Sequence, residues 1–291
     1  MVPFVLFPLP VPLLASTSPA PLRGAILAVS VLHDIDLTVT SDGVRLDGRP
    51  PVRLGWPDLA EAARGVAPQS AAGVGRLVDY LRARQLLVAG TAADRVGPGS
   101  AGAPRPYAVT VGSSMHPGPG WAQAAVRGGI LELGLGLSGL RSACPGVVFP
   151  LPEAAGRHAG VDLAAAQAEA GRYLDAMASL AVARFDRRPA DPLRPMGDCD
   201  VLTLLASAPY RAGLVAGSAT GGLRAVAVPM RDRGWADLRH TDREFLICAA
   251  AVTPPERRGC DRALLVTREE VTVTPWRPRS PAPSPAGLPP R

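Results

Sequence analysis

The sequence contains no lysine, so all 31 of its permanently cationic side chains are arginine. P-loop NTPases need a lysine ammonium on their phosphates, and protein kinases need one on their third strand. Schiff-base enzymes need an amine that can lose its proton, whereas the guanidinium of arginine stays protonated in proteins. The absence therefore argues against these classes, and neither a nucleotide nor pyridoxal phosphate is expected as a cofactor.

Asparagine is absent as well, while alanine, glycine, proline, arginine and valine are abundant, which is typical of a very GC-rich genome. The number of arginines is thus no evidence of nucleic-acid binding. The formal net charge is +6, and half of it lies on residues 277–291, which carry three arginines and no acid. The rest of the chain is close to neutral, so nucleic acid is not expected as a partner.

The four cysteines stand singly, without a C-x-x-C pair or zinc-like spacing (Cys144, Cys199, Cys248 and Cys260). This pattern is typical of a reduced chain, so a cytoplasmic location is expected. Residues 2–15 are apolar, but no positive charge precedes Arg23 and four prolines would break the helix of a signal peptide. We expect residues 1–22 to be a disordered or artefactual extension, with secretion through an atypical signal peptide as the alternative. No apolar run reaches the length of about 18 residues that a membrane span needs.

Strand and helix patterns alternate irregularly along the chain, which predicts an α+β fold: a mixed sheet with packed helices. Composition divides the chain into a small hairpin-plus-helices unit at 23–88, a linker or long loop at 89–106, a main α+β domain at 107–276 and a disordered tail at 277–291. The expected elements are a hairpin (37–40 with 44–48), a helix opening at Trp56, helices over 70–88 and 162–186, a helix over 200–216 that Pro209 interrupts, strands at 107–111 and 222–230, a helix capped by Thr241 and Glu244, and a final hairpin (263–267 with 271–276).

A G-x-G-x-x-G pattern runs from Gly134 to Gly139 and follows the candidate strand 130–133. A dinucleotide site would next need a helix of about three turns, and Pro145-Gly146 leaves no room for one. We therefore interpret the pattern as a glycine-rich packing segment.

The most concentrated polar cluster, Arg194 to Asp200, directly precedes an apolar helix. The simplest interpretation is that Asp198 or Asp200 caps that helix, because a helix N-terminus exposes unpaired N–H groups. Two adjacent carboxylates oppose thiolate formation at Cys199, so a cysteine nucleophile is not expected. The alternative makes Asp198 and Asp200 ligands of a hard divalent metal, or a general acid/base pair.

That alternative needs an imidazole from elsewhere in the chain. His116 is the best candidate because glycine and proline bound its loop, and His33, near Asp34 and Asp36, is a further metal candidate. The predicted catalytic set is His116, Asp198 and Asp200, with Arg194 holding an anionic substrate through its bidentate fork.

Residues 57–88 contain two successive helices, and Arg76, Arg82 and Arg84 on the second would be placed to touch phosphates if the pair were a helix-turn-helix. The simpler interpretation is a small packing unit with a solvated arginine face.

The runs LHDIDLTVT, HPGPGW, RPMGDCDV, GLRAVAVPM and LLVTREEV together resemble a group of uncharacterised hypothetical proteins from high-GC actinobacteria. The likeness extends from about Arg23 to Val273, and residues 1–22 depart from it. The resemblance implies an origin in a high-GC actinobacterium and a cytoplasmic location, and it implies no activity. Three hypotheses follow from the sequence: an intracellular protein without an assigned activity, a metal- or acid/base-dependent hydrolase or transferase, and a DNA-associated regulator.

Overall fold

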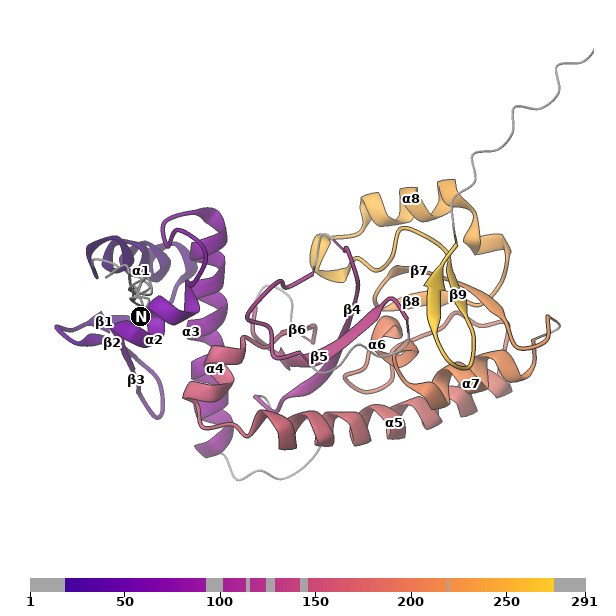
Figure 1. Ribbon diagram of the computed structural model, residues 1–291, viewed down its shortest axis with the longest axis horizontal. Coiled ribbons are helices and arrows are strands. Elements are labelled where there is room, and N and C mark those ends of the chain that lie inside the picture. The colour runs from indigo at the N-terminus through magenta and orange to yellow at the C-terminus, as the bar shows by residue number, and fades with distance from the viewer. Residues whose placement is uncertain are drawn as a thin grey trace, which may run out of the picture. The chain divides into compact units, whose positions relative to one another are not determined.

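The computed structural model describes residues 19–92, 102–113, 116–123, 129–141, 146–218 and 220–274. The chain divides into two compact units, Met1–Leu81 and Arg82–Arg291, and each is described here by itself (Figure 1). The sequence predicted a linker at 89–106, whereas this division falls inside a helix; residues 93–101 of that linker lie outside the described residues. The predicted tail and most of the predicted extension lie outside them too. Within the described ranges, no helix combines the length and apolar composition of a membrane span.

The smaller unit begins with a helix and a three-stranded antiparallel sheet. The predicted hairpin is confirmed, since Leu37 pairs with Leu46 and Val39 with Val44. A further strand, which the sequence analysis missed, pairs along the second hairpin strand. The elements are α1 (Pro19–His33), β1 (Leu37–Val39), β2 (Gly43–Leu46), β3 (Val52–Gly55), α2 (Trp56–Ala62) and the start of α3 (Ala71–Ala92).

Helix α1 was not predicted, and its first four residues, 19–22, belong to the expected extension. Leu22, Ile26 and Val29 are all buried, and their spacing is that of one helical face. The helix ends at His33, and Asp34 then adopts a positive φ of 52°. The helical period was therefore present in the sequence, within a segment interpreted as apolar extension.

The larger unit carries two antiparallel sheets, ordered β4-β5-β6 and β10-β9-β7-β8. The α+β class is confirmed, but the expectation of a mixed sheet is wrong for the named strands, because every one of their pairings is antiparallel. Parallel pairing is limited, among the described residues, to one bridge between Gly129 and Val271. The elements are β4 (Arg105–Thr110), β5 (Leu131–Ser138), β6 (Val148–Pro150), α4 (Glu153–His158), α5 (Leu163–Arg187), α6 (Val201–Leu205), α7 (Ala208–Ala216), β7 (Arg224–Met230), β8 (Arg233–Trp235), η1 (Arg239–Thr241), α8 (Arg243–Val252), η2 (Pro255–Arg257), β9 (Leu264–Val266) and β10 (Val271–Val273).

Helix α5 is the longest element of this unit and packs against α7 and against β4 and β5 (Figure 1). Its N-cap is Asp162, whose carboxylate accepts a hydrogen bond from the Ala165 N–H. Its buried face repeats at helical spacing and ends at Phe185 (Ala170, Leu174, Ala178, Ala181 and Phe185). Leu180 is 53% exposed because it lies off that face.

The predicted interruption at Pro209 is confirmed, since α6 ends at Leu205 and α7 starts at Ala208 with this proline in its first turn. The cap of α8 differs from the prediction. Asp242 is the N-cap, and its carboxylate accepts hydrogen bonds from the Glu244 and Phe245 N–H groups. The Thr241 hydroxyl instead donates to the Leu238 carbonyl, so the N-cap lies one residue later than predicted.

The glycine pattern lies in strand β5 and in the turn that follows it. A Cβ on Gly134 would lie 2.5 Å from the Trp121 ring, and a Cβ on Gly136 would lie 2.5 Å from Val148. These two glycines are required by close packing. The next element among the described residues is strand β6, whereas a phosphate-binding loop needs a helix there.

Candidate functional site

The structure assigns the two predicted catalytic aspartates to ion pairs that tie strands to helix α6. Asp200 is the N-cap of α6: its Oδ1 accepts from the Thr203 N–H at 2.8 Å, and its Oδ2 accepts from Arg231 Nε at 2.6 Å. Asp198 Oδ2 accepts from Arg105 Nε at 2.6 Å. Each carboxylate therefore has its own arginine partner, and Asp200 also caps α6.

Arg231 has the most complete set of partners in this cluster. Its side chain is 7% exposed, its Nη2 donates to the Ala108 carbonyl at 2.6 Å, and its guanidinium lies 4.3 Å from the centre of the Tyr107 ring. The arrangement joins β4, α6 and the turn between β7 and β8. A buried arginine with such partners holds elements together and has little freedom to bind a ligand.

Cys199 lies between these two acids and is fully buried. Burial raises the pKa of its thiol, and the charges of Asp200 and Asp198 raise it further. The prediction that Cys199 is not a nucleophile agrees with this shift, because only the thiolate is reactive.

His116 is held by a different set of contacts. Its Nε2 lies 2.5 Å from Glu132 Oε2, and its Nδ1 accepts a hydrogen bond from the Gly118 N–H at 3.0 Å. Since Nδ1 is the acceptor, Nε2 carries the proton and donates it to the carboxylate. Both ring nitrogens are therefore occupied, and the imidazole offers no free lone pair to a substrate.

The predicted grouping of His116 with Asp198 and Asp200 has no counterpart as a metal site. In the part of the chain that the structure describes, no three His, Cys, Asp or Glu side chains gather closely enough to hold a metal ion. His33, the other metal candidate, is the last residue of α1 in the smaller unit. The hydrolase or transferase hypothesis thus keeps no supporting contact at these residues.

The regulator hypothesis depends on a row of exposed arginines along α3. Arg84 is 7% exposed, and its Nη1 lies 3.5 Å from the Ala155 carbonyl. Arg76 donates to the Arg64 carbonyl at 2.7 Å. Arg76, Arg82 and Arg84 therefore do not form one solvent-facing stripe.

Arg194, the predicted substrate-binding residue, lines a cleft at the end of α5. The cleft has about 290 Å³ of empty space, counted out to its open mouth. We call it the arginine cleft, and its lining comes from the last turns of α5, the segment that follows, and α7 (Ala181, Arg184, Phe185, Arg188, Asp191, Pro192, Leu193, Arg194 and Tyr210). Three arginines and one acid thus face the same small space.

The arginines of this cleft have few partners. Arg184 reaches the Pro195 carbonyl at 3.4 Å, and Arg188 lies 3.9 Å from Asp191, which is a long ion pair between exposed side chains. Arg194 is exposed, and no described residue hydrogen-bonds to its guanidinium. Weakly paired donors on three converging arginines are available to an anion.

The floor of the arginine cleft is apolar and firmly built. Phe185 and Tyr210 are both buried, and Leu193 pairs with Gly234 through two backbone hydrogen bonds of 2.7 and 3.0 Å. A fourth cation, Arg224, lies 5.2 Å from the centre of the Phe185 ring. Burial lowers the pKa of Arg224, and its Nε has no hydrogen-bond partner among the described residues. The local potential is therefore more positive than the lining residues alone imply.

Tyr210 adds a polar group to this floor. Burial raises the pKa of its phenol, although the charge of Arg184 acts in the opposite direction. The hydroxyl therefore stays protonated, and no described residue hydrogen-bonds to it.

The sequence analysis found one residue of this cleft, Arg194, and missed Arg184, Arg188 and Tyr210. The available signal was the i, i+4 spacing of Arg184, in the last turn of the predicted helix 162–186, and Arg188, just beyond its end. Cations are common there because they interact with the helix dipole, so the spacing has an ordinary structural explanation. Only the fold brings this turn against Arg194 and Tyr210.

Comparisons of the chain with protein-family models, with curated proteins and with solved structures found no match. The resemblance to hypothetical actinobacterial proteins therefore stays a prediction.

Proposed function

We propose that the larger unit binds a small anionic ligand, a phosphate monoester or a dicarboxylate, in the arginine cleft. The observation that supports this most is the charge balance of the lining, where Arg184, Arg188 and Arg194 face Asp191 alone. Guanidinium groups match phosphate and carboxylate oxygens bidentately, which is the chemistry that the sequence assigned to Arg194.

Charge favours a dianion over a monoanion. Three guanidinium groups and one carboxylate leave a formal excess of two positive charges in the cleft. The three cations repel one another, and a bound dianion removes that repulsion while it accepts their hydrogen bonds. Because the cleft is open to water, the attraction weakens as salt is added.

The size and lining of the cleft restrict the rest of the ligand. The volume of about 290 Å³ includes open solvent, so the enclosed part of the cleft is small and admits only a compact group, beside which Phe185 and Leu193 offer an apolar surface. A phosphate monoester with a compact organic group combines these features.

The test is a calorimetric titration of the full chain with phenyl phosphate and with inorganic phosphate at low ionic strength. We expect phenyl phosphate to bind with a Kd of about 1 mM or tighter. Arg194→Ala should weaken binding by about 10- to 100-fold, the effect of losing one charge-assisted hydrogen-bonding group.

Arg187→Ala is the matched control. Arg187 is in the last turn of α5 and has the same charge as Arg194, but its Nε donates to the Ala183 carbonyl at 2.9 Å and it does not line the cleft. Binding that is absent in the wild-type chain, or that falls equally in both variants, contradicts a specific cleft.

A further inference from the structure

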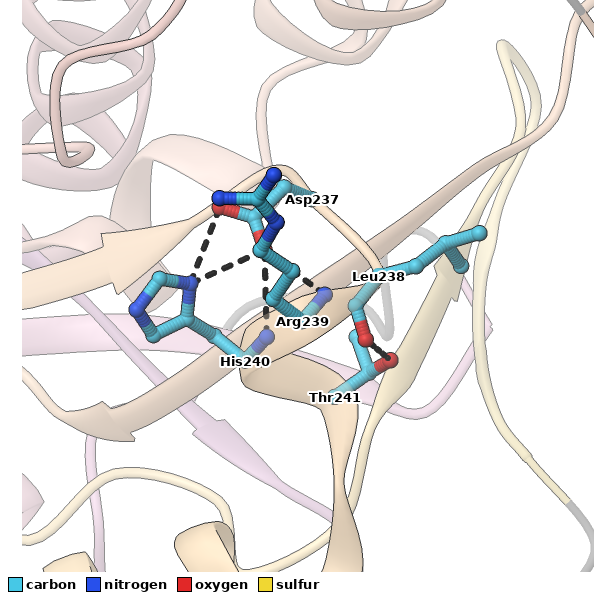
Figure 2. A network of polar contacts seen from close by, with 5 residues as sticks. All are labelled: Asp237, Leu238, Arg239, His240 and Thr241. Carbon is cyan, nitrogen blue, oxygen red and sulfur yellow. Dashed lines mark hydrogen bonds and ion pairs between the residues drawn. The ribbon is translucent and has the colours of Figure 1, made fainter.

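A histidine outside the predicted set has the contacts of a reactive imidazole. His240 lies in the short helix η1, and its Nδ1 is 2.9 Å from both carboxylate oxygens of Asp237 (Figure 2). The same Asp237 Oδ1 accepts hydrogen bonds from the Arg239 and His240 N–H groups at 2.8 and 3.0 Å. These two backbone hydrogen bonds fix the position of the carboxylate relative to the imidazole.

These contacts determine which ring nitrogen carries the proton. Asp237 can only accept while it is ionised, and its pKa stays below the usual value: burial alone would raise it, but the hydrogen bonds from His240 and from the backbone lower it. Nδ1 of His240 is therefore the donor, and in the neutral ring the lone pair is on Nε2. No described residue bonds to Nε2, and the side chain is 34% exposed.

Aromatic side chains hold the ring in one orientation. The imidazole is stacked on Trp235, with ring centres 4.7 Å apart and an angle of 11° between the planes. The Phe245 ring meets it edge-on, at 5.2 Å and 73°. Asp237, Trp235 and Phe245 thus fix the imidazole from three sides, and Nε2 is its remaining polar atom.

This is the opposite of the situation at His116, where Glu132 and the Gly118 N–H occupy both ring nitrogens. Each of these histidines has a carboxylate partner, so an acid beside the ring does not distinguish them. The difference is which nitrogen the carboxylate takes and whether the other remains open.

We infer that the Asp237–His240 pair is a second chemical site of the larger unit, at which Nε2 of His240 accepts an acyl group from a small activated ester and transfers it to water. The Nε2 lone pair attacks the ester carbonyl carbon, and the leaving oxygen departs with the electron pair of its bond to that carbon. Water then attacks the acyl-imidazolium, the bond from carbon to Nε2 breaks, and its electron pair returns to Nε2. The products are the carboxylic acid, the free alkoxide or phenolate and one proton, so the ring is regenerated.

Asp237 is a positioning residue in this reaction. It keeps the proton on Nδ1 and stabilises the positive charge that the ring carries as the acyl-imidazolium.

The first test is chemical and needs no variant. The full chain is treated with a small excess of diethyl pyrocarbonate, and the modified histidines are identified by mass spectrometry over time. We expect His240 to be carbethoxylated first and His116 to react at least about tenfold more slowly, because its nitrogens are both hydrogen-bonded. Reaction at His240 that is no faster than at His116 overturns the proposal.

The second test is the rate of p-nitrophenyl acetate hydrolysis. We expect His240→Ala to remove most of the rate above buffer. Asp237→Asn keeps an oxygen for the two backbone N–H groups and removes the charge, so it should lower the rate about tenfold while the circular dichroism spectrum is retained. His158→Ala is the matched control at another imidazole and should leave the rate unchanged. A wild-type rate in His240→Ala, or equal losses in His158→Ala, overturns the proposal.

Discussion

Replacement of Arg231 by methionine should destabilise the larger unit by about 3–5 kcal/mol, the usual cost of removing one partner from a buried ion pair. The change leaves Asp200, whose side chain is 19% exposed, without its cation, and leaves the Ala108 carbonyl without its 2.6 Å donor. The contact with the Tyr107 ring is lost as well. Methionine fills much of the space of the arginine stem, so the loss is mainly electrostatic.

The double variant Arg231→Met/Asp200→Asn tests the pairing itself. Asparagine remains a good N-cap for α6, so Asp200→Asn removes the charge and keeps the acceptor for Thr203. Each single change leaves a buried charge unpaired, and the double change leaves none. We therefore expect the double variant to be more stable than the sum of the single effects predicts, by about 1–3 kcal/mol.

The assay is urea unfolding followed by tryptophan fluorescence and circular dichroism, with Trp121 and Trp235 reporting on the larger unit. Arg157→Met is the control, because the Arg157–Glu153 pair is about half exposed and should be worth no more than about 0.5 kcal/mol. Strictly additive single effects would contradict the structural role. So would a stabilising Asp200→Asn, because carboxylates that serve function are often kept at a cost in stability.

Three further predictions follow from other contacts. Iodoacetamide should label Cys248 in the native chain and spare Cys199 and Cys260, because burial raises the pKa of both thiols; peptide mass spectrometry would show the contrary as early labelling at Cys199. Gly136→Ala should destabilise the larger unit by about 1–3 kcal/mol, because the added Cβ would lie 2.5 Å from Val148. Gly171→Ala in α5 should stabilise it by about 1 kcal/mol, because that Cβ would have no neighbour within 4 Å. Equal unfolding midpoints for the two variants would refute this reasoning. Asp237→Asn should lower the free energy of unfolding by less than about 1 kcal/mol at pH 7, because the lowered pKa of the Asp237 carboxyl adds stability above its unfolded pKa of 3.8. This stability is lost as the pH falls through the folded pKa. The urea midpoints of the variant and the wild type should therefore converge near about pH 2.

Much of the secondary structure was predictable because it depends on local patterns. The hairpin at 37–46, helix α5 and the break at Pro209 follow from alternation, helical period and the missing N–H of proline. Helix α1 was missed because its period lies within an apolar stretch next to prolines. The mixed sheet was wrong because strand direction depends on which distant strands meet, and local sequence carries little of that information.

The candidate sites divide in the same way. That Asp200 caps a helix is a local fact, and the sequence predicted it as one of two choices. That Arg231 comes 31 positions later in the chain to neutralise Asp200 is not local, and it changes the interpretation of the acid from catalytic to structural. The Asp237–His240 pair is local, at a spacing of three residues, but a spacing alone does not show which nitrogen the carboxylate takes.

In a chain without lysine, structural cations and ligand-binding cations are both arginine, so residue type does not distinguish them. The hydrogen bonds that each guanidinium group already donates do distinguish them. Arg231 donates hydrogen bonds to Asp200 and to the Ala108 carbonyl. Arg211 donates to the carbonyls of Leu205, Ala206 and Glu269. A cation that binds a ligand must keep donors free until the ligand arrives, and Arg194 does so. The same comparison applied to acceptors pairs Asp198 with Arg105 and Asp200 with Arg231, which gives both carboxylates a structural role. Applied to imidazoles, it separates His116, with both nitrogens engaged, from His240, with one nitrogen open.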